Sequence, residues 1–201
     1  MRRLATFVLL LSLPLIASPA AAQASDPRFD ASVHVNWATS GQFDTTTVGV
    51  GGRFAWYPLS PLGLEAEVAF YPADWPDRPA FSSGQQEALF GATLGPRLGP
   101  LRPFGKVRAG ALRLAEGQAP LVCILIFPPP LSCQLAIGDT LPALDFGGGL
   151  EFGTRRAFLR ADVSDRMVRY PGPVIDQDLT VHDSPFWSHD LRIGLGVGVR
   201  F

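Results

Sequence analysis

The chain has 201 residues, of which 17 are basic and 18 acidic, so its formal net charge at neutral pH is −1. This near-balance of charge argues against a protein that binds nucleic acid through a basic surface. The 21 glycines, 19 prolines and 14 phenylalanines are instead typical of many short strands joined by turns.

The first 24 residues have the three parts of a secretory signal peptide. Arg2 and Arg3 form a basic start, residues 4–17 form an apolar core, and residues 22–24 form an Ala-Gln-Ala cleavage site. As a transmembrane helix this segment is too short, and two prolines interrupt it. We therefore expect the mature chain to be a single domain over residues 25–201.

Eight segments of alternating polarity follow in chain order, with apolar side chains at every second position. They are residues 32–38, 46–57, 62–71, 87–97, 103–114, 143–152, 157–164 and 190–201. In the last segment every odd position from Leu191 to Phe201 is apolar, and every even position is charged or glycine. This alternation predicts strands with one apolar and one polar face.

The sequence offers no second layer to cover these apolar faces. No amphipathic helical segment is present, although a soluble sheet would need one. The longest apolar run after the signal peptide, residues 119–131, contains three prolines and is too short to span a bilayer as a helix. The apolar faces of the strands would therefore be covered by lipid. Strands can cross a bilayer only as a closed barrel. The predicted fold class is all-β, an eight-stranded antiparallel up-and-down transmembrane barrel.

The connections between these segments alternate in length. Short connections at residues 58–61, 96–102 and 153–156 alternate with long ones at residues 72–86, 115–141 and 165–189. Outer-membrane barrels have this asymmetry, with tight periplasmic turns and longer external loops. The even number of strands predicts that both termini lie on the periplasmic side.

The mature chain resembles the small eight-stranded outer-membrane proteins of the OmpA/OmpX-like family. The resemblance rests on the signal peptide, the alternating segments, the Pro103-Phe104 strand opening, the glycine-rich strand at residues 147–152 and the terminal Phe201. It implies a place in the outer membrane of a diderm bacterium, among outer-membrane lipid and lipopolysaccharide. No peptidoglycan-binding domain is expected, because nothing follows Phe201.

The resemblance also implies that the last strand is an assembly signal, read by the barrel insertion machinery. The residues that would form it are Ile193, Leu195, Val197, Val199 and Phe201.

The interior of an eight-stranded barrel is just wide enough for side chains to fill it, so the inward residues decide whether it conducts. The alternation places acids and bases in similar numbers there: Arg53, Glu65, Glu67, Glu87, Arg97, Lys106, Arg108, Asp145, Glu151, Arg160, Asp162 and Arg192. Unpaired, each acid would cost several kcal/mol, so this balance predicts an ion-pair network that plugs the barrel. The alternative is that Glu65, Glu67 and Arg108 form a gate or a proton path.

Cys123 and Cys133 lie in the long connection at residues 115–141. In an exported chain with only two cysteines, we expect them to form a disulfide. The apolar residues 124–131 between them either contact a partner or the lipopolysaccharide surface, or fold over the barrel mouth. No cofactor is expected, and no metal site, because no other ligand lies at a suitable spacing.

His182 and Ser184 are the candidate catalytic residues of the last long connection. They resemble the His-x-Ser motif of outer-membrane lipid A deacylases. That family places an asparagine after the serine and a glutamate farther along the strand, where this chain has Pro185 and a glycine. We therefore expect a polar loop without catalysis.

Three functions are compatible with the sequence. The first is a non-enzymatic barrel whose surface loops act in envelope integrity, adhesion or binding of a partner that the sequence does not identify. The second is a small passive channel, and the third is a lipid A-modifying hydrolase that uses His182 and Ser184.

Overall fold

The computed structural model describes residues 28–41, 45–72, 84–116, 138–172, 174–175, 181–182 and 184–201. Its long strands are β1 (Phe29–Ser40), β2 (Thr45–Leu59), β3 (Leu62–Tyr71), β4 (Gln85–Leu94), β5 (Leu101–Leu114), β6 (Asp139–Gly153), β7 (Ala157–Tyr170) and β10 (Phe186–Arg200). Two short strands, β8 (Val174–Ile175) and β9 (Val181–His182), pair with each other. The expected signal peptide and both cysteines lie outside the described residues. Within the described part of the chain, no helix has the length and apolar character needed to cross a membrane.

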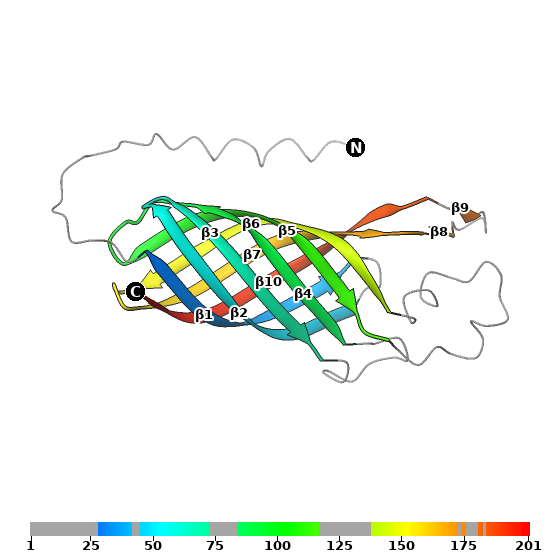
Figure 1. Cartoon of the computed structure of the whole chain (residues 1–201), viewed down its shortest axis with the longest axis horizontal. Coiled ribbons are helices and arrows are strands. Elements are labelled where there is room, and N and C mark those ends of the chain that lie inside the picture. Colours follow the sequence, from blue (N-terminus) through cyan, green and yellow to red (C-terminus); the bar gives the residue numbers. More distant parts are fainter. Residues whose placement is uncertain are drawn as a thin grey trace, which may run out of the picture.

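The eight long strands form a closed barrel in the order β1-β10-β7-β6-β5-β4-β3-β2 (Figure 1). Each strand pairs antiparallel with its two neighbours. At the seam, the backbone N–H of Phe29 donates to the carbonyl of Phe201 (3.0 Å), and the N–H of Phe201 donates to the carbonyl of Phe29 (2.9 Å). The predicted fold class is confirmed.

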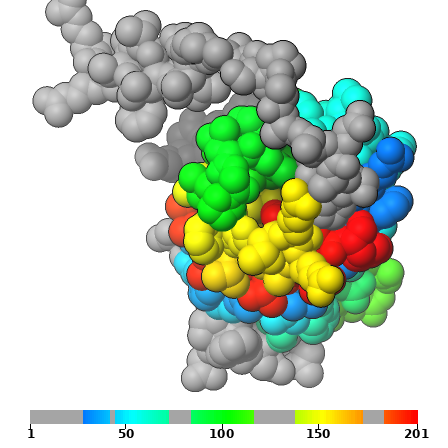
Figure 2. All heavy atoms as spheres, turned by 90° about the vertical axis from the view of Figure 1, so that its left-hand side faces the viewer, coloured from blue at the N-terminus to red at the C-terminus, as the bar shows by residue number. Residues whose placement is uncertain are grey.

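The two ends of the barrel differ in their connections. The turns at residues 60–61, 95–100 and 154–156 share one end with the C-terminus, at the left of Figure 1, and we call this the short-turn end. Figure 2 looks onto this end and shows the β4–β5 turn, the β6–β7 turn and the end of the chain gathered there. The strand ends that flank the longer connections, at residues 72–84, 115–138 and 171–185, share the opposite end, which we call the long-loop end.

Several strands are longer than their alternation predicted. β7 continues to Tyr170 instead of ending at residue 164, and β10 begins at Phe186. The reason is that the pattern inverts after residue 164: Asp165 and Arg169 face outward, whereas Val168 and Tyr170 are buried inside. An inverted pattern of this kind is that of an ordinary sheet in water, with its apolar face inward.

These inward apolar residues fill the barrel toward the long-loop end. Their cluster comprises Leu112, Leu114, Leu141, Val168 and Tyr170, and Phe186 packs against it. The ring of Tyr170 stacks on that of Phe186 with centroids 5.4 Å apart. The interior therefore changes along the barrel axis from charged groups to apolar ones. In the other direction, β4 ends at Leu94 instead of the predicted residue 97, and Pro96, which cannot donate a ladder hydrogen bond, follows.

Candidate functional site: the charged barrel interior

All but one of the predicted interior residues face the inside of the barrel, and they come from seven strands. Arg53, Glu65, Glu67, Glu87, Lys106, Arg108, Asp145, Glu151, Arg160 and Arg192 are buried. The side chain of Asp162 is 8% exposed. Arg97 lies past the end of β4, half-buried in the β4–β5 turn, with its guanidinium 5.1 Å from the centre of the Tyr57 ring.

Arg108 forms the centre of the charged interior. Its Nη1 donates to Oε2 of Glu67 (2.6 Å), and its Nε and Nη2 donate to Oδ2 of Asp145 (2.9 and 2.6 Å). Oε1 of Glu65 lies 3.3 Å from Nη1 of Arg108. Lys106, the next inward residue on β5, forms an ion pair with Asp162 and lies 3.7 Å from Asp145. One cation on β5 thus holds carboxylates from β3 and β6 together.

Arg160 extends the ion pairs toward the short-turn end. Its Nη1 lies 3.1 Å from Oε2 of Glu65 and 3.3 Å from Oε1 of Glu151. Glu151 also accepts hydrogen bonds from Arg102 (3.2 Å) and Arg200 (2.9 Å). Arg102 in turn donates to the hydroxyl of Tyr57 (2.7 Å).

Arg192 extends the ion pairs in the opposite direction. It pairs with Glu67 near the centre, and its Nη1 lies 3.0 Å from Oε1 of Glu87. Arg166 then bridges Glu87 (2.6 Å) and Asp190 (2.8 Å). Oδ1 of Asp190 accepts the backbone N–H of Gly41 at the long-loop end (3.2 Å). The ion pairs are therefore continuous from Arg200 at one end of the barrel to Asp190 at the other.

Five members of this network among the described residues were missed in the sequence: Asp30, which lies 3.6 Å from Arg200, and Arg102, Arg166, Asp190 and Arg200. Arg166 was placed in a loop because the alternation inverts at that point, and Arg102 was placed in a turn. Asp190 and Arg200 lie at the two ends of the predicted last strand, on the same face as Arg192, but they were not assigned to the network. Extending the β7 alternation by six residues would have placed Arg166 inside.

Inward glycines make room for the bulky members of the interior. His34 on β1 lies between Gly51 on β2 and Gly196 on β10, and its Nε2 is 3.4 Å from Oε1 of Glu67. A Cβ atom at Gly51 would lie 2.5 Å from that same Nε2. Tyr71, which is fully buried, packs in the same way against Gly49. These glycines are therefore packing positions.

Replacing Gly49 by alanine should destabilise the barrel by about 1–3 kcal/mol, as overpacking does. The new Cβ would lie 2.4 Å from Cδ1 of Tyr71, a residue that is fully buried. Gly52 is a matched control, because it faces outward on the same strand and a Cβ there would meet nothing nearer than 3.9 Å. Urea unfolding in micelles should give a free energy within about 0.5 kcal/mol of the parent for Gly52→Ala. Equal losses at both positions would contradict the packing account.

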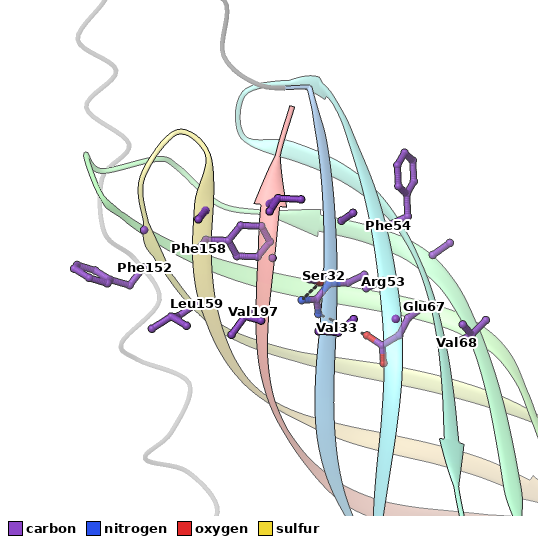
Figure 3. Close-up of a pocket in the computed structure, with 17 residues that line it drawn as sticks. Ser32, Val33, Arg53, Phe54, Glu67, Val68, Phe152, Phe158, Leu159 and Val197 are labelled. Carbon is purple, nitrogen blue, oxygen red and sulfur yellow. Dashed lines mark hydrogen bonds and ion pairs between the residues drawn. The ribbon is translucent and has the colours of Figure 1, made fainter.

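The outer face of the barrel is covered by exposed apolar side chains. Figure 3 shows Val33, Phe54, Val68, Phe152, Leu159 and Val197 pointing away from the barrel, while Arg53 and Glu67 point into it. At the seam, the ring of Phe29 stacks on Phe54 (5.8 Å between centroids) and on Phe201 (5.9 Å). The predicted assembly residues Ile193, Leu195, Val197, Val199 and Phe201 all lie on this outer face and are exposed.

The described part of the chain does not show His182 and Ser184, the candidate catalytic residues, together in a site. The backbone of His182 belongs to β9, but its side chain lies outside the description, and Ser184 is exposed just before β10. Among the described residues, no group of three or more His, Cys, Asp or Glu side chains could hold a metal ion.

Comparison with known proteins identifies the fold. No protein-family model matches the chain, and no curated protein matches its sequence. Among solved structures, Neisserial surface protein A matches with a TM-score of 0.58 and 14% identity, covering 88% of this chain and 98% of that one. The N-terminal barrel of OprF from Pseudomonas aeruginosa matches with a TM-score of 0.53 and 12% identity, covering 86% and 97%. Ail, the attachment invasion locus protein of Yersinia pestis, matches with 0.52 and 11%, covering 88% and 99%.

At such low identities the likeness concerns the fold alone. The chain has the fold of the small eight-stranded outer-membrane barrels, as its resemblance to them predicted.

Proposed function

We propose that this chain is an integral outer-membrane β-barrel without enzymatic activity, closed inside by ion pairs and active through its cell-surface loops. Those loops are the connections at the long-loop end, and their roles are envelope integrity, adhesion or partner binding. The proposal includes export through a signal peptide cleaved after residue 24 and a disulfide between Cys123 and Cys133. It also includes recognition of the last strand by the barrel insertion machinery.

The observation that carries the proposal is the apolar belt on the outer face. Large apolar side chains that are about half exposed or more occur on every strand of the barrel, among them Val33, Val50, Val68, Phe90, Val107, Leu150, Val163 and Leu195. A continuous surface of this kind is far larger than the apolar patches that soluble monomers expose. Lipid chains can cover this surface because the sheet closes on itself and leaves no open strand edge in the bilayer.

The belt has a polar edge toward the long-loop end. On seven strands, the first outward residue past the belt is polar: Thr39, Thr46, Gln86, Arg113, Thr140, Asp165 and His189. Side chains of this kind belong at the headgroup level of a bilayer. Two strands continue past this edge by several residues, β7 to Tyr170 and β10 from Phe186, and they would project from the membrane surface (Figure 1). The long connections would then lie outside the cell, as tight periplasmic turns and longer external loops imply.

The paired interior favours a closed barrel over a channel. Arg108, Arg160 and Arg192 each hold two or more carboxylates, and all three side chains are at most 1% exposed. Opening a pore would require separating these pairs, at several kcal/mol for each buried ion. We therefore expect planar bilayers that contain the folded protein to stay at baseline conductance. Stable current steps from protein that runs as the folded form in gels would contradict a closed interior.

Catalysis on lipid A is tested by mass spectrometry of lipid A from cells that express the protein. We expect spectra identical to those of cells without it, and the same spectra for His182→Ala. A change in acyl chains that His182→Ala abolishes would overturn the non-enzymatic assignment.

A further inference from the structure

Two outward arginines lie at the long-loop end of the belt: Arg113 is itself the edge residue of β5, and Arg169 lies four residues past Asp165, the edge residue of β7. On β5, Arg113 follows the half-buried Ala111, and on β7, Arg169 lies beyond Val163 and Asp165. Both arginines are exposed. Trp187 on β10 is the register partner of Arg169, faces outward and is 41% exposed.

The register brings the two arginines to neighbouring positions on the sheet. Arg113 is paired with Thr140 of β6, and Ala143 of β6 is paired with Val168 of β7, the residue before Arg169. The two arginines are thus two strands apart and offset by about two residues. With ordinary strand spacing and rise, their Cα atoms are about 12 Å apart, within reach of two long side chains that converge on one headgroup.

The acidic side chains near this surface are not paired with the two arginines in the described part of the chain. Asp165, the acidic residue of the polar edge on β7, is already hydrogen-bonded through Oδ2 to Nδ1 of His189 (2.7 Å). No acidic side chain of the described residues forms an ion pair with Arg113 or Arg169. The guanidinium groups therefore face the bilayer surface without a protein counter-ion in the part of the chain that is described.

We propose that Arg113 and Arg169, with Trp187 beside them, bind the phosphate groups of a phosphorylated glycolipid in the outer leaflet, the lipid A part of lipopolysaccharide. This inference rests on the proposed membrane placement, because only the long-loop end then faces that leaflet. Guanidinium groups bind phosphate through two parallel hydrogen bonds, and indole rings favour the interface. Charge complementarity, and a position at the edge of the belt for Arg113 and just beyond it for Arg169, select this ligand over an uncharged lipid.

The test is reconstitution of the mature protein into phospholipid vesicles that contain either bis-phosphorylated lipid A or the same lipid A without phosphates. Lipid retained by the extracted barrel is counted by native mass spectrometry. The parent should retain the phosphorylated form about tenfold better, and Arg113→Gln/Arg169→Gln should lose most of this preference. The control is Arg155→Gln/Arg156→Gln, which removes two exposed arginines from the β6–β7 turn at the other end and should retain lipid like the parent.

Equal retention of both lipid A forms by the parent, or unchanged retention by Arg113→Gln/Arg169→Gln, would overturn the inference. Competition by free inorganic phosphate at the concentration of the lipid would also overturn it, because the site would then select a small anion. Gel shifts of the same samples separate this inference from the proposed function. If the protein inserts and folds but shows no lipid A preference, only the lipid site fails, whereas failure to insert in any vesicle refutes both.

Discussion

Replacing Arg108 by methionine is expected to destabilise the barrel by about 3–5 kcal/mol, the cost of removing one partner from a buried ion pair. Arg108 lies 2.6 Å from both Glu67 and Asp145, and its side chain is fully buried. Its loss leaves these carboxylates with fewer cations in a place that water does not reach. Urea unfolding in micelles, followed by tryptophan fluorescence or the gel shift, measures the change.

Two further variants distinguish charge pairing from simple loss of volume. Arg155→Met removes an exposed arginine from the β6–β7 turn and should change the free energy of unfolding by less than about 0.5 kcal/mol. Arg108→Met combined with Asp145→Leu should be more stable than Arg108→Met alone, because it removes one of the stranded carboxylates together with its partner. An Arg108→Met protein as stable as the parent would show that the interior is wet and does not depend on these pairs.

Replacing the terminal Phe201 by serine is expected to remove most of the folded protein from the outer membrane of cells. The last strand resembles the assembly signal of outer-membrane barrels, and the proposed signal includes its terminal aromatic residue. In the folded barrel the Phe201 ring contributes only modestly to the free energy of unfolding, because it is 62% exposed and contacts Phe29 by stacking. Refolding into micelles should therefore succeed, with a loss of about 2 kcal/mol for one lipid-facing aromatic side chain.

Phe54 is the matched control for Phe201. Its ring is 46% exposed, stacks on the same Phe29 at nearly the same distance, and lies within β2 away from the end of the chain. Phe54→Ser should lose a similar amount of stability in micelles and still assemble in cells. If both variants fail in cells to the same degree, the effect of Phe201 is one of stability, and the last strand carries no separate signal.

The barrel was predictable because lipid and a narrow interior impose opposite demands on alternate residues. β3 shows this most clearly: Glu65 and Glu67 face the interior, Val68 and Phe70 face outward, and its predicted bounds match the structure. The prediction was wrong where a strand leaves the membrane. There the same period of two continues with its polarity reversed, so residues 165–170 of β7 were placed in a loop.

The interior was harder to predict than the strands that form it. Alternation gives the face of each residue, but not which of several arginines reaches a given carboxylate across the barrel. Arg160 on β7 and Glu65 on β3 are far apart in sequence and are not on neighbouring strands, yet their side chains lie 3.1 Å apart. Such pairs depend on the shear and diameter of the closed barrel, which only the full register fixes.

The most direct test of the membrane barrel is the gel mobility of the protein in outer-membrane fractions, compared with and without boiling. A folded barrel with continuous ion pairs resists the detergent and should migrate differently from the boiled chain in that fraction. Recovery of the protein only in soluble fractions, or identical mobility before and after boiling, would contradict the account.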